Sequence, residues 1–273
     1  MKVLDSAFCK DYVTMADDSW NLGYHERNGG NFTYRMTKED VESVRDDLSF
    51  DAEWKEIGTD VPALAGEFFM VTGSGKFFRW IKEKTAETCG IIEVDSTGSK
   101  YRIVWGLVGG GRPTSELPSH LMNHEVKLHA TGGAHRIIFH CHPANLIALT
   151  FVVPATDAAV TRALWESMTE CPVIFPAGVG VLPWMVCGGR EIAVASAEKM
   201  KKYDLVVWAH HGIFASADTF DNAIGLIHCV EKSAEIYLKI RAVTENKVQT
   251  ITRENFLDLA KAFGFTINEE FLK

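Results

Sequence analysis

Apolar residues recur at helical spacing in several parts of the chain. Over residues 6–22 they fall on one stripe of a 3.6-residue period, and Gly23 is a natural stop for that helix. A second helix opens near Glu116, with Pro118 in its first turn, where proline is favoured. The same reasoning predicts four further helices, over 145–152, after Thr156, over roughly 220–243, and from near Thr252 to Gly264.

Runs of β-branched and aromatic residues bounded by turn signals predict strands between these helices. Two runs, 91–94 and 101–107, flank the turn 95–98 and therefore predict a hairpin, which requires antiparallel pairing. Residues 37–61 are charged and weakly patterned, so we expect a surface excursion there. The chain has no internal repeat and no Pro/Ser-rich linker, which predicts one α/β domain over residues 1–273 with a partly antiparallel sheet. The other predicted strands are 32–35, 68–71, 136–142 and 205–209.

The overall composition is that of a folded globular protein, with 47% apolar and 23% charged residues. The net charge of −8, with no Lys/Arg cluster to offset it, argues against nucleic acid or an anionic membrane as the main partner. Six widely spaced cysteines without a Cys-x-x-Cys pair favour free thiols in a reducing compartment. No segment approaches the roughly 18 uninterrupted apolar residues of a membrane span, and the first residues do not resemble a signal peptide. We therefore expect a cytoplasmic protein.

Three histidines at strand ends form a candidate metal site. His140 and His142 occupy positions i and i+2 of a predicted strand, so their side chains share one face with roughly 6.5 to 7 Å between Cα atoms. A third ligand must come from elsewhere, and His211 also lies where a buried strand gives way to a glycine turn. The adjacent His210 would face the other way on an extended strand. Three histidines leave one coordination position open, which is typical of a catalytic zinc site.

Spacing alone leaves other interpretations open. A His-x-His pair also occurs as ordinary hydrogen-bonded histidines at strand ends. A rival group lies on the helix after Glu116, where Glu116, His120 and His124 are spaced i, i+4 and i+8 on one face. For His120 and His124 we expect a solvated helix face.

Glycine-rich loops offer candidate phosphate-binding groups. The segment 72–76 follows a predicted strand and supplies backbone N–H groups, two hydroxyls and Lys76, although Phe77 in the next position excludes a P-loop. Segment 28–31 could serve the same purpose, and segment 114–116 lies at a helix N-terminus, where hydroxyls cap the helix or bind an anion. Loops such as 72–76 and 28–31 are more often plain turns, and segment 114–116 is also explained as a helix cap.

Together these residues resemble the class II aldolase/adducin-like family, in order from about Trp20 to the C-terminal helix. The His-x-His pair with a distant third histidine occurs across the superfamily, whereas the strings around Glu116 and Glu170 are more specific. Two departures are His210, where an apolar residue is expected, and the divergent segment 38–60. The matching segments are 26–31, 72–78, 113–118, 140–142, 145–150, 164–171, 182–186 and 211–212.

The resemblance implies a three-layer α/β/α fold with a largely antiparallel central sheet. It implies a lyase that cleaves a ketose phosphate to dihydroxyacetone phosphate and an aldehyde, with one Zn²⁺ per subunit on His140, His142 and His211. Glu116 would be the general base, and Glu170 would reach in from a neighbouring subunit of a cyclic homotetramer to help protonate the aldehyde oxygen. The implied phosphate and substrate contacts are Asn28, Gly30, Asn31, Ser74, Gly75, Thr114 and Ser115.

Two alternatives stay open beside this interpretation. One is another enzyme of the superfamily, a fuculose-phosphate aldolase or a pentulose-phosphate 4-epimerase, which uses the same metal and similar loops. The other is a metal-free, adducin-like interaction module. The presence of all three histidines and both glutamates argues against the module.

Overall fold

The computed structural model describes residues 1–272, which contain one mixed sheet of nine strands. The strand order is β2-β5-β4-β3-β1-β6-β9-β8-β7, and neighbouring strands are antiparallel except for β7 and β8. The prediction of a largely antiparallel central sheet is confirmed. The strands are β1 (Asn31–Arg35), β2 (Lys55–Glu56), β3 (Phe68–Thr72), β4 (Cys89–Val94), β5 (Lys100–Gly106), β6 (Ile137–Cys141), β7 (Gly180–Leu182), β8 (Leu205–Trp208) and β9 (Gly212–Ala217).

Helices cover both faces of this sheet, and the six helices expected from apolar periodicity are all present. The α-helices within residues 1–272 are α1 (Ala7–Asn21), α2 (Lys38–Val44), α3 (Thr85–Thr88), α4 (Leu117–Ala130), α5 (Ala144–Val152), α6 (Asp157–Trp165), α7 (Glu170–Ile174), α8 (Arg190–Met200), α9 (Phe220–Val243) and α10 (Arg253–Phe263). Short 3₁₀ turns are η1 (Val3–Asp5), η2 (Arg45–Asp47), η3 (Pro62–Leu64), η4 (Phe78–Trp80) and η5 (Glu269–Leu272).

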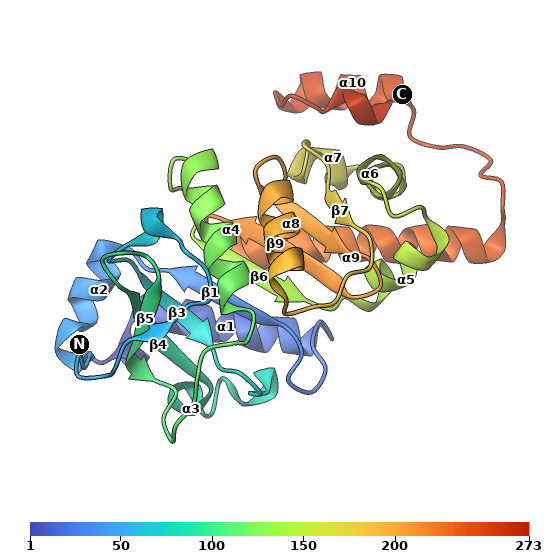
Figure 1. Ribbon diagram of the computed structural model, residues 1–273. Helices are drawn as coiled ribbons and strands as arrows, with labels where there is room; N and C mark the ends of the chain where they lie inside the picture. Colours follow the sequence, from blue (N-terminus) through green and yellow to red (C-terminus); the bar gives the residue numbers. More distant parts are fainter. Residues whose placement is uncertain (273) are drawn as a thin grey trace.

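The molecule has three layers (Figure 1). Helices α4 and α8 pack against each other and lie over one face of the sheet, whereas α1, α5 and α9 cover the opposite face. This arrangement confirms the α/β/α prediction. It also places the N-terminus of α4 close to the ends of the central strands, where the candidate site lies.

Central strand β6 is buried on both faces, as a strand between two helical layers must be. Because successive side chains alternate, Phe139 and Cys141 join the core beneath α1 and α9, while Ile138 packs with Trp208 on the side of α8. His140 has the same parity as Ile138. The pattern of burial therefore directs His140 toward the layer that contains α4 and α8.

The segment 37–61 is more ordered than its weak pattern predicts. Helix α2 starts there with a complete capping box, in which the Thr37 and Asp40 side chains each accept a hydrogen bond from the other's backbone N–H. Val41 and Val44 bury its inner face. Apolar periodicity does not predict this short helix, because two buried residues make no measurable period. Strand β9 and helix α8 are likewise absent from the elements predicted from the sequence.

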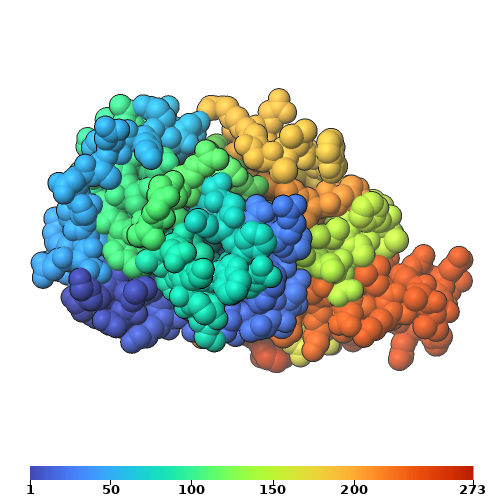
Figure 2. Space-filling view, turned by 90° about the horizontal axis from the view of Figure 1, so that it is seen from below, coloured from blue at the N-terminus to red at the C-terminus, as the bar shows by residue number. Residues whose placement is uncertain are grey.

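The two halves of the chain lie side by side along the sheet, and the C-terminal part of α9 projects from the body (Figure 2). Across residues 1–272, no helix combines the length and apolar character needed to cross a membrane. All six cysteines, which lie within the described part of the chain, are free thiols, and four are buried.

Candidate metal centre and active site

Two strand ends bring the three predicted metal-ligating histidines together. His140 lies on β6, and His142 follows the end of that strand. Strand β6 pairs with β9 so that Cys141 is opposite Ile213, which brings the turn between β8 and β9 next to His142. His210 takes a left-handed φ of 64° in this turn. The tight turn, and not a continued extended strand, decides which of the two adjacent histidines joins the cluster.

The close approach of the two strand ends depends on Gly212. A Cβ atom there would lie 2.3 Å from the carbonyl oxygen of Cys141 and 2.9 Å from the ring of His142. Any side chain at this position would push the strand ends apart. Gly212 therefore sets the distance between His142 and His211.

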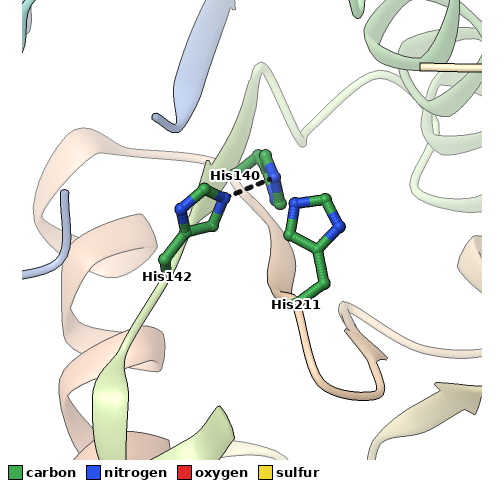
Figure 3. A group of neighbouring side chains, drawn as sticks. All are labelled: His140, His142 and His211. Atoms are coloured by element: carbon green, nitrogen blue, oxygen red, sulfur yellow. Dashed lines mark hydrogen bonds between the residues drawn. The ribbon is translucent and has the colours of Figure 1, made fainter. Parts of the chain in front are cut away.

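The three imidazoles converge on one point (Figure 3). One nitrogen from each ring lies within 4.8 Å of the others, and Nε2 of His140 is 3.2 Å from Nε2 of His142. Nδ1 of His140 donates to the carbonyl oxygen of Ile213 at 3.0 Å, and Nδ1 of His142 donates to the Glu26 carboxylate at 2.8 Å. Because a neutral imidazole has one N–H, both Nε2 atoms present lone pairs to the same space. Facing lone pairs fit a shared cation.

Burial keeps the rings of His140 and His211 in the neutral form that ligates metals. It lowers the pKa of His140 well below the usual value, with His142 and His211 nearby adding to the effect. Burial and the neighbouring His142 lower the pKa of His211 to about 4. Neutral imidazole is the ligand form of histidine, so no proton has to leave these two rings before a metal binds at neutral pH.

Glu26 is a site residue that the local sequence did not reveal. Its carboxylate orients His142, which is the usual arrangement behind a metal-ligating histidine. The two residues are 116 positions apart, so no spacing rule connects them.

Glu116 lies beside the histidines at the N-terminus of α4. Its Oε2 is 3.7 Å from Nε2 of His140, and the residue is only 8% exposed. Burial raises the pKa of Glu116, while a hydrogen bond from Asn31 Nδ2 at 2.7 Å acts in the opposite direction. Asn31 is opposite His140 in the register of β1 and β6. The site therefore places a carboxylate that can give or accept a proton beside three histidines that can bind a metal.

Strand pairing also gathers the predicted phosphate loops. The N–H of Thr114 donates to the carbonyl oxygen of Thr72 at 2.9 Å, and that of Ser74 donates to the carbonyl oxygen of Arg112 at 2.8 Å. Segments 72–76 and 112–115 thus lie side by side at the end of β3. Strands β1 and β3 are antiparallel, so the start of β1 also lies beside these two segments at the end of β3.

Within this group of loops, Gly30 cannot be replaced without a collision. It has a φ of 76°, and a Cβ there would lie 2.2 Å from Nδ1 of His25. The predicted contact residues all lie in these loops or at the start of β1, where the central strands β1 and β3 meet them: Asn28, Gly30, Asn31, Ser74, Gly75, Thr114 and Ser115.

The expectation of a solvated face at His120 and His124 is wrong. Both residues are buried, because α4 turns this face toward β1 and not toward water. Thr33 on β1 contacts both rings, at 2.9 Å and 2.8 Å. These histidines are not metal ligands together with Glu116; they form a polar contact between helix and sheet.

Glu170 lies away from the histidine cluster of its own chain. It starts α7, which leads into the beginning of β7, whereas His211 follows the end of the parallel strand β8. The pocket beside α7 is accordingly lined by residues from the opposite end of the sheet, among them His135 and Asp204. Glu170 is exposed.

A pocket of about 630 Å³ opens beside the cluster. The residues that line it include the polar side chains of Glu26, His142 and His211 and the apolar side chains of Ile147 and Trp184. Two of the three clustered histidines therefore border this pocket.

The chain resembles proteins of known family over most of its length. Residues 10–238 match the family described as Class II Aldolase and Adducin N-terminal domain. A protein named rhamnulose-1-phosphate aldolase from Mannheimia succiniciproducens is 47% identical over 264 residues, covering 97% of each chain. One of the same name from Pectobacterium atrosepticum is 46% identical over 271 residues, covering 99% of this chain and 98% of that protein.

Solved structures share the fold. A sugar-phosphate aldolase from Thermotoga maritima has a TM-score of 0.74 at 25% identity, covering 88% of this chain and 97% of that one. An L-fuculose-1-phosphate aldolase from Thermus thermophilus has a TM-score of 0.59 at 20% identity, covering 88% and 97%. At 20% identity, the second likeness concerns the fold alone.

Proposed function

The chain belongs to the class II aldolase and adducin N-terminal domain family, and on that premise we propose that it reversibly cleaves L-rhamnulose 1-phosphate to dihydroxyacetone phosphate and L-lactaldehyde. Because the chain is similar over nearly its whole length to proteins named rhamnulose-1-phosphate aldolase, it is a metal-dependent aldolase, which is a type of lyase. One observation carries the proposal for the site: three converging histidines stand beside a buried carboxylate.

His140, His142 and His211 hold the metal in this proposal, one Zn²⁺ per subunit. The lone pairs of two Nε2 atoms 3.2 Å apart, and the all-nitrogen donor set, fit zinc. When bound, the metal supplies a Lewis acid that polarises the substrate carbonyl and stabilises the negative charge developing on the three-carbon fragment.

Glu116 moves the proton. Cleavage of the C3–C4 bond leaves C3 of the three-carbon fragment in need of a proton, and in the synthetic direction that proton is removed again. A carboxylate with a raised pKa can both give and take it. Asn31 holds Glu116 in place through the hydrogen bond at 2.7 Å, and we also assign it the contact with the substrate hydroxyls.

The neighbouring loops bind the phosphate. Backbone N–H groups and hydroxyls at the start of β1 and the end of β3, near the N-terminus of α4, suit a dianion. The residues that we assign to this role are Asn28, Gly30, Ser74, Gly75, Thr114 and Ser115.

Glu170 acts across a subunit boundary in this proposal. It lies at the far end of the sheet from its own His211, so only a neighbouring copy could bring it near the histidines. In a cytoplasmic homotetramer, Glu170 of a neighbouring subunit would take the proton from the C4 hydroxyl during cleavage and return it to the aldehyde oxygen during synthesis.

The competing activity is that of a fuculose-phosphate aldolase or a pentulose-phosphate 4-epimerase with the same site. The test compares kcat/KM for L-rhamnulose 1-phosphate and L-fuculose 1-phosphate, with release of dihydroxyacetone phosphate as the readout. A preference for fuculose 1-phosphate overturns the substrate assignment. Purified protein with no stoichiometric metal and no chelator-sensitive activity would instead support the non-catalytic module.

A further inference from the structure

A buried chain of hydrogen bonds runs between β1 and α4 and ends on Glu116. Nε2 of His124 is 2.8 Å from Thr33 Oγ1, which is 2.9 Å from Nδ1 of His120. Nε2 of His120 contacts Oδ1 of Asn31, whose Nδ2 reaches Glu116 Oε2 at 2.7 Å. All five residues are buried. Four bonds thus connect the interior of the protein to the carboxylate.

When Glu116 is ionised, donor and acceptor chemistry allows one assignment of the protons in this chain. An ionised Glu116 only accepts, so Asn31 must present Nδ2 to it and Oδ1 to His120. Oδ1 also only accepts, so Nε2 of His120 carries the hydrogen and Nδ1 accepts from the Thr33 hydroxyl. Thr33 has then used its single proton and accepts from Nε2–H of His124. Every donor points toward the carboxylate.

The two rings carry no charge that would disturb this order. Burial lowers the pKa of His120 to about 3. Burial also lowers the pKa of His124 well below its usual value, and nearby His120 and Arg35 act in the same direction. A neutral chain in a low-dielectric interior is polarised from bond to bond, which strengthens its last member, the bond from Asn31 to Glu116.

We propose that His120 is a positioning residue for the base Glu116, acting through the amide of Asn31. Thr33 and His124 fix His120 as the Nε2–H tautomer, and this tautomer holds the Asn31 amide in the orientation that can donate to a carboxylate. The other tautomer would reverse the amide and set its oxygen against Glu116. The inference rests on the proposed function, because it assigns a role to neighbours of the proposed base.

The first test replaces Thr33 with an isosteric residue that has no hydroxyl. We expect Thr33→Val to lower kcat for the retro-aldol reaction about tenfold, or about 1.4 kcal/mol, with KM and metal content little changed. Thr33→Ser keeps the hydroxyl and recovers most of that rate. The matched control is Thr161→Val, which removes another fully buried hydroxyl, bonded to Val179 and remote from the site. This control costs thermal stability and leaves kcat unchanged.

A second pair of variants tests His120 directly. His120→Gln can place an N–H near the position of ring Nε2, whereas His120→Leu cannot, so we expect the glutamine variant to be the more active. In a double-mutant cycle, adding His120→Leu to Glu116→Gln should not lower the residual rate further, because both substitutions act through the carboxylate of Glu116.

The outcomes separate this inference from the proposed function. A wild-type kcat in both Thr33→Val and His120→Leu overturns the positioning role. So does a Thr33→Ser variant that is no more active than Thr33→Val, or a double-mutant cycle in which the effects of His120→Leu and Glu116→Gln add. An active Glu116→Gln enzyme instead overturns the role of the base, whatever the Thr33 variants do. An inactive Glu116→Gln with an unchanged Thr33→Val refutes the positioning role alone.

Discussion

Replacing Glu26 by alanine removes the carboxylate that accepts a hydrogen bond from Nδ1 of His142. With the partner gone, the ring can rotate and exchange tautomers, so Nε2 no longer points at the other two histidines without cost. We expect Glu26→Ala to bind the proposed zinc ion more weakly while the fold stays intact.

The size of the effect follows from the exposure of Glu26. Loss of a partner behind a metal ligand typically weakens metal affinity 10–100-fold, roughly 1.4–2.7 kcal/mol. The Glu26 side chain is 65% exposed, so water can partly replace its carboxylate. We therefore expect the lower end, about tenfold. Glu26→Gln keeps a neutral acceptor and should fall between alanine and wild type.

The assay is a competition titration of Zn²⁺ between the metal-free protein and a chromophoric chelator. Glu198→Ala is the matched control, since its side chain is 68% exposed and its ion pair with Lys201 lies at the C-terminal end of α8, before β8 starts, whereas His211 follows the end of β8. Equal zinc affinity in Glu26→Ala, Glu198→Ala and wild type would refute the orienting role of Glu26.

Three further perturbations have expected results. Gly212→Ala places a Cβ 2.3 Å from the Cys141 carbonyl oxygen and should cost about 1–3 kcal/mol of stability, seen as a lower Tm and weaker zinc binding; an unchanged Tm contradicts this. Glu116→Gln should bind zinc normally and lose about 10²–10⁴-fold in kcat, and full turnover would exclude it as the base. Burial lowers the pKa of both His25 and His120 from 6.5 to about 3. Unfolding therefore takes up protons below pH 6.5. As far as these two rings are concerned, the free energy of unfolding is highest above pH 6.5 and decreases as the pH falls from 6.5 toward 3. Urea unfolding of the metal-free protein between pH 7 and 5 should show stability falling by up to about 1.4 kcal/mol per unit for each ring, and a flat profile would mean that the rings are solvated.

Local pattern was sufficient for much of the architecture. The long helix α9, the hairpin of β4 and β5, and strand β6 each carry a period or a turn signal within their own residues. The pair His140 and His142 was also visible locally, because a strand has a period of two. Such features need no knowledge of what the segment packs against.

The composition of the site depended on contacts between distant segments. Whether His210 or His211 joins the cluster is set by a left-handed turn that ends β8, and Glu26 reaches His142 from 116 residues away. His120 was expected on a solvated face because periodicity identifies a stripe on a helix without saying what covers it. Here β1 covers it, and Thr33 satisfies the buried ring. Burial, proton position and pKa are properties of packing, so they appear only once strand register has brought these side chains together.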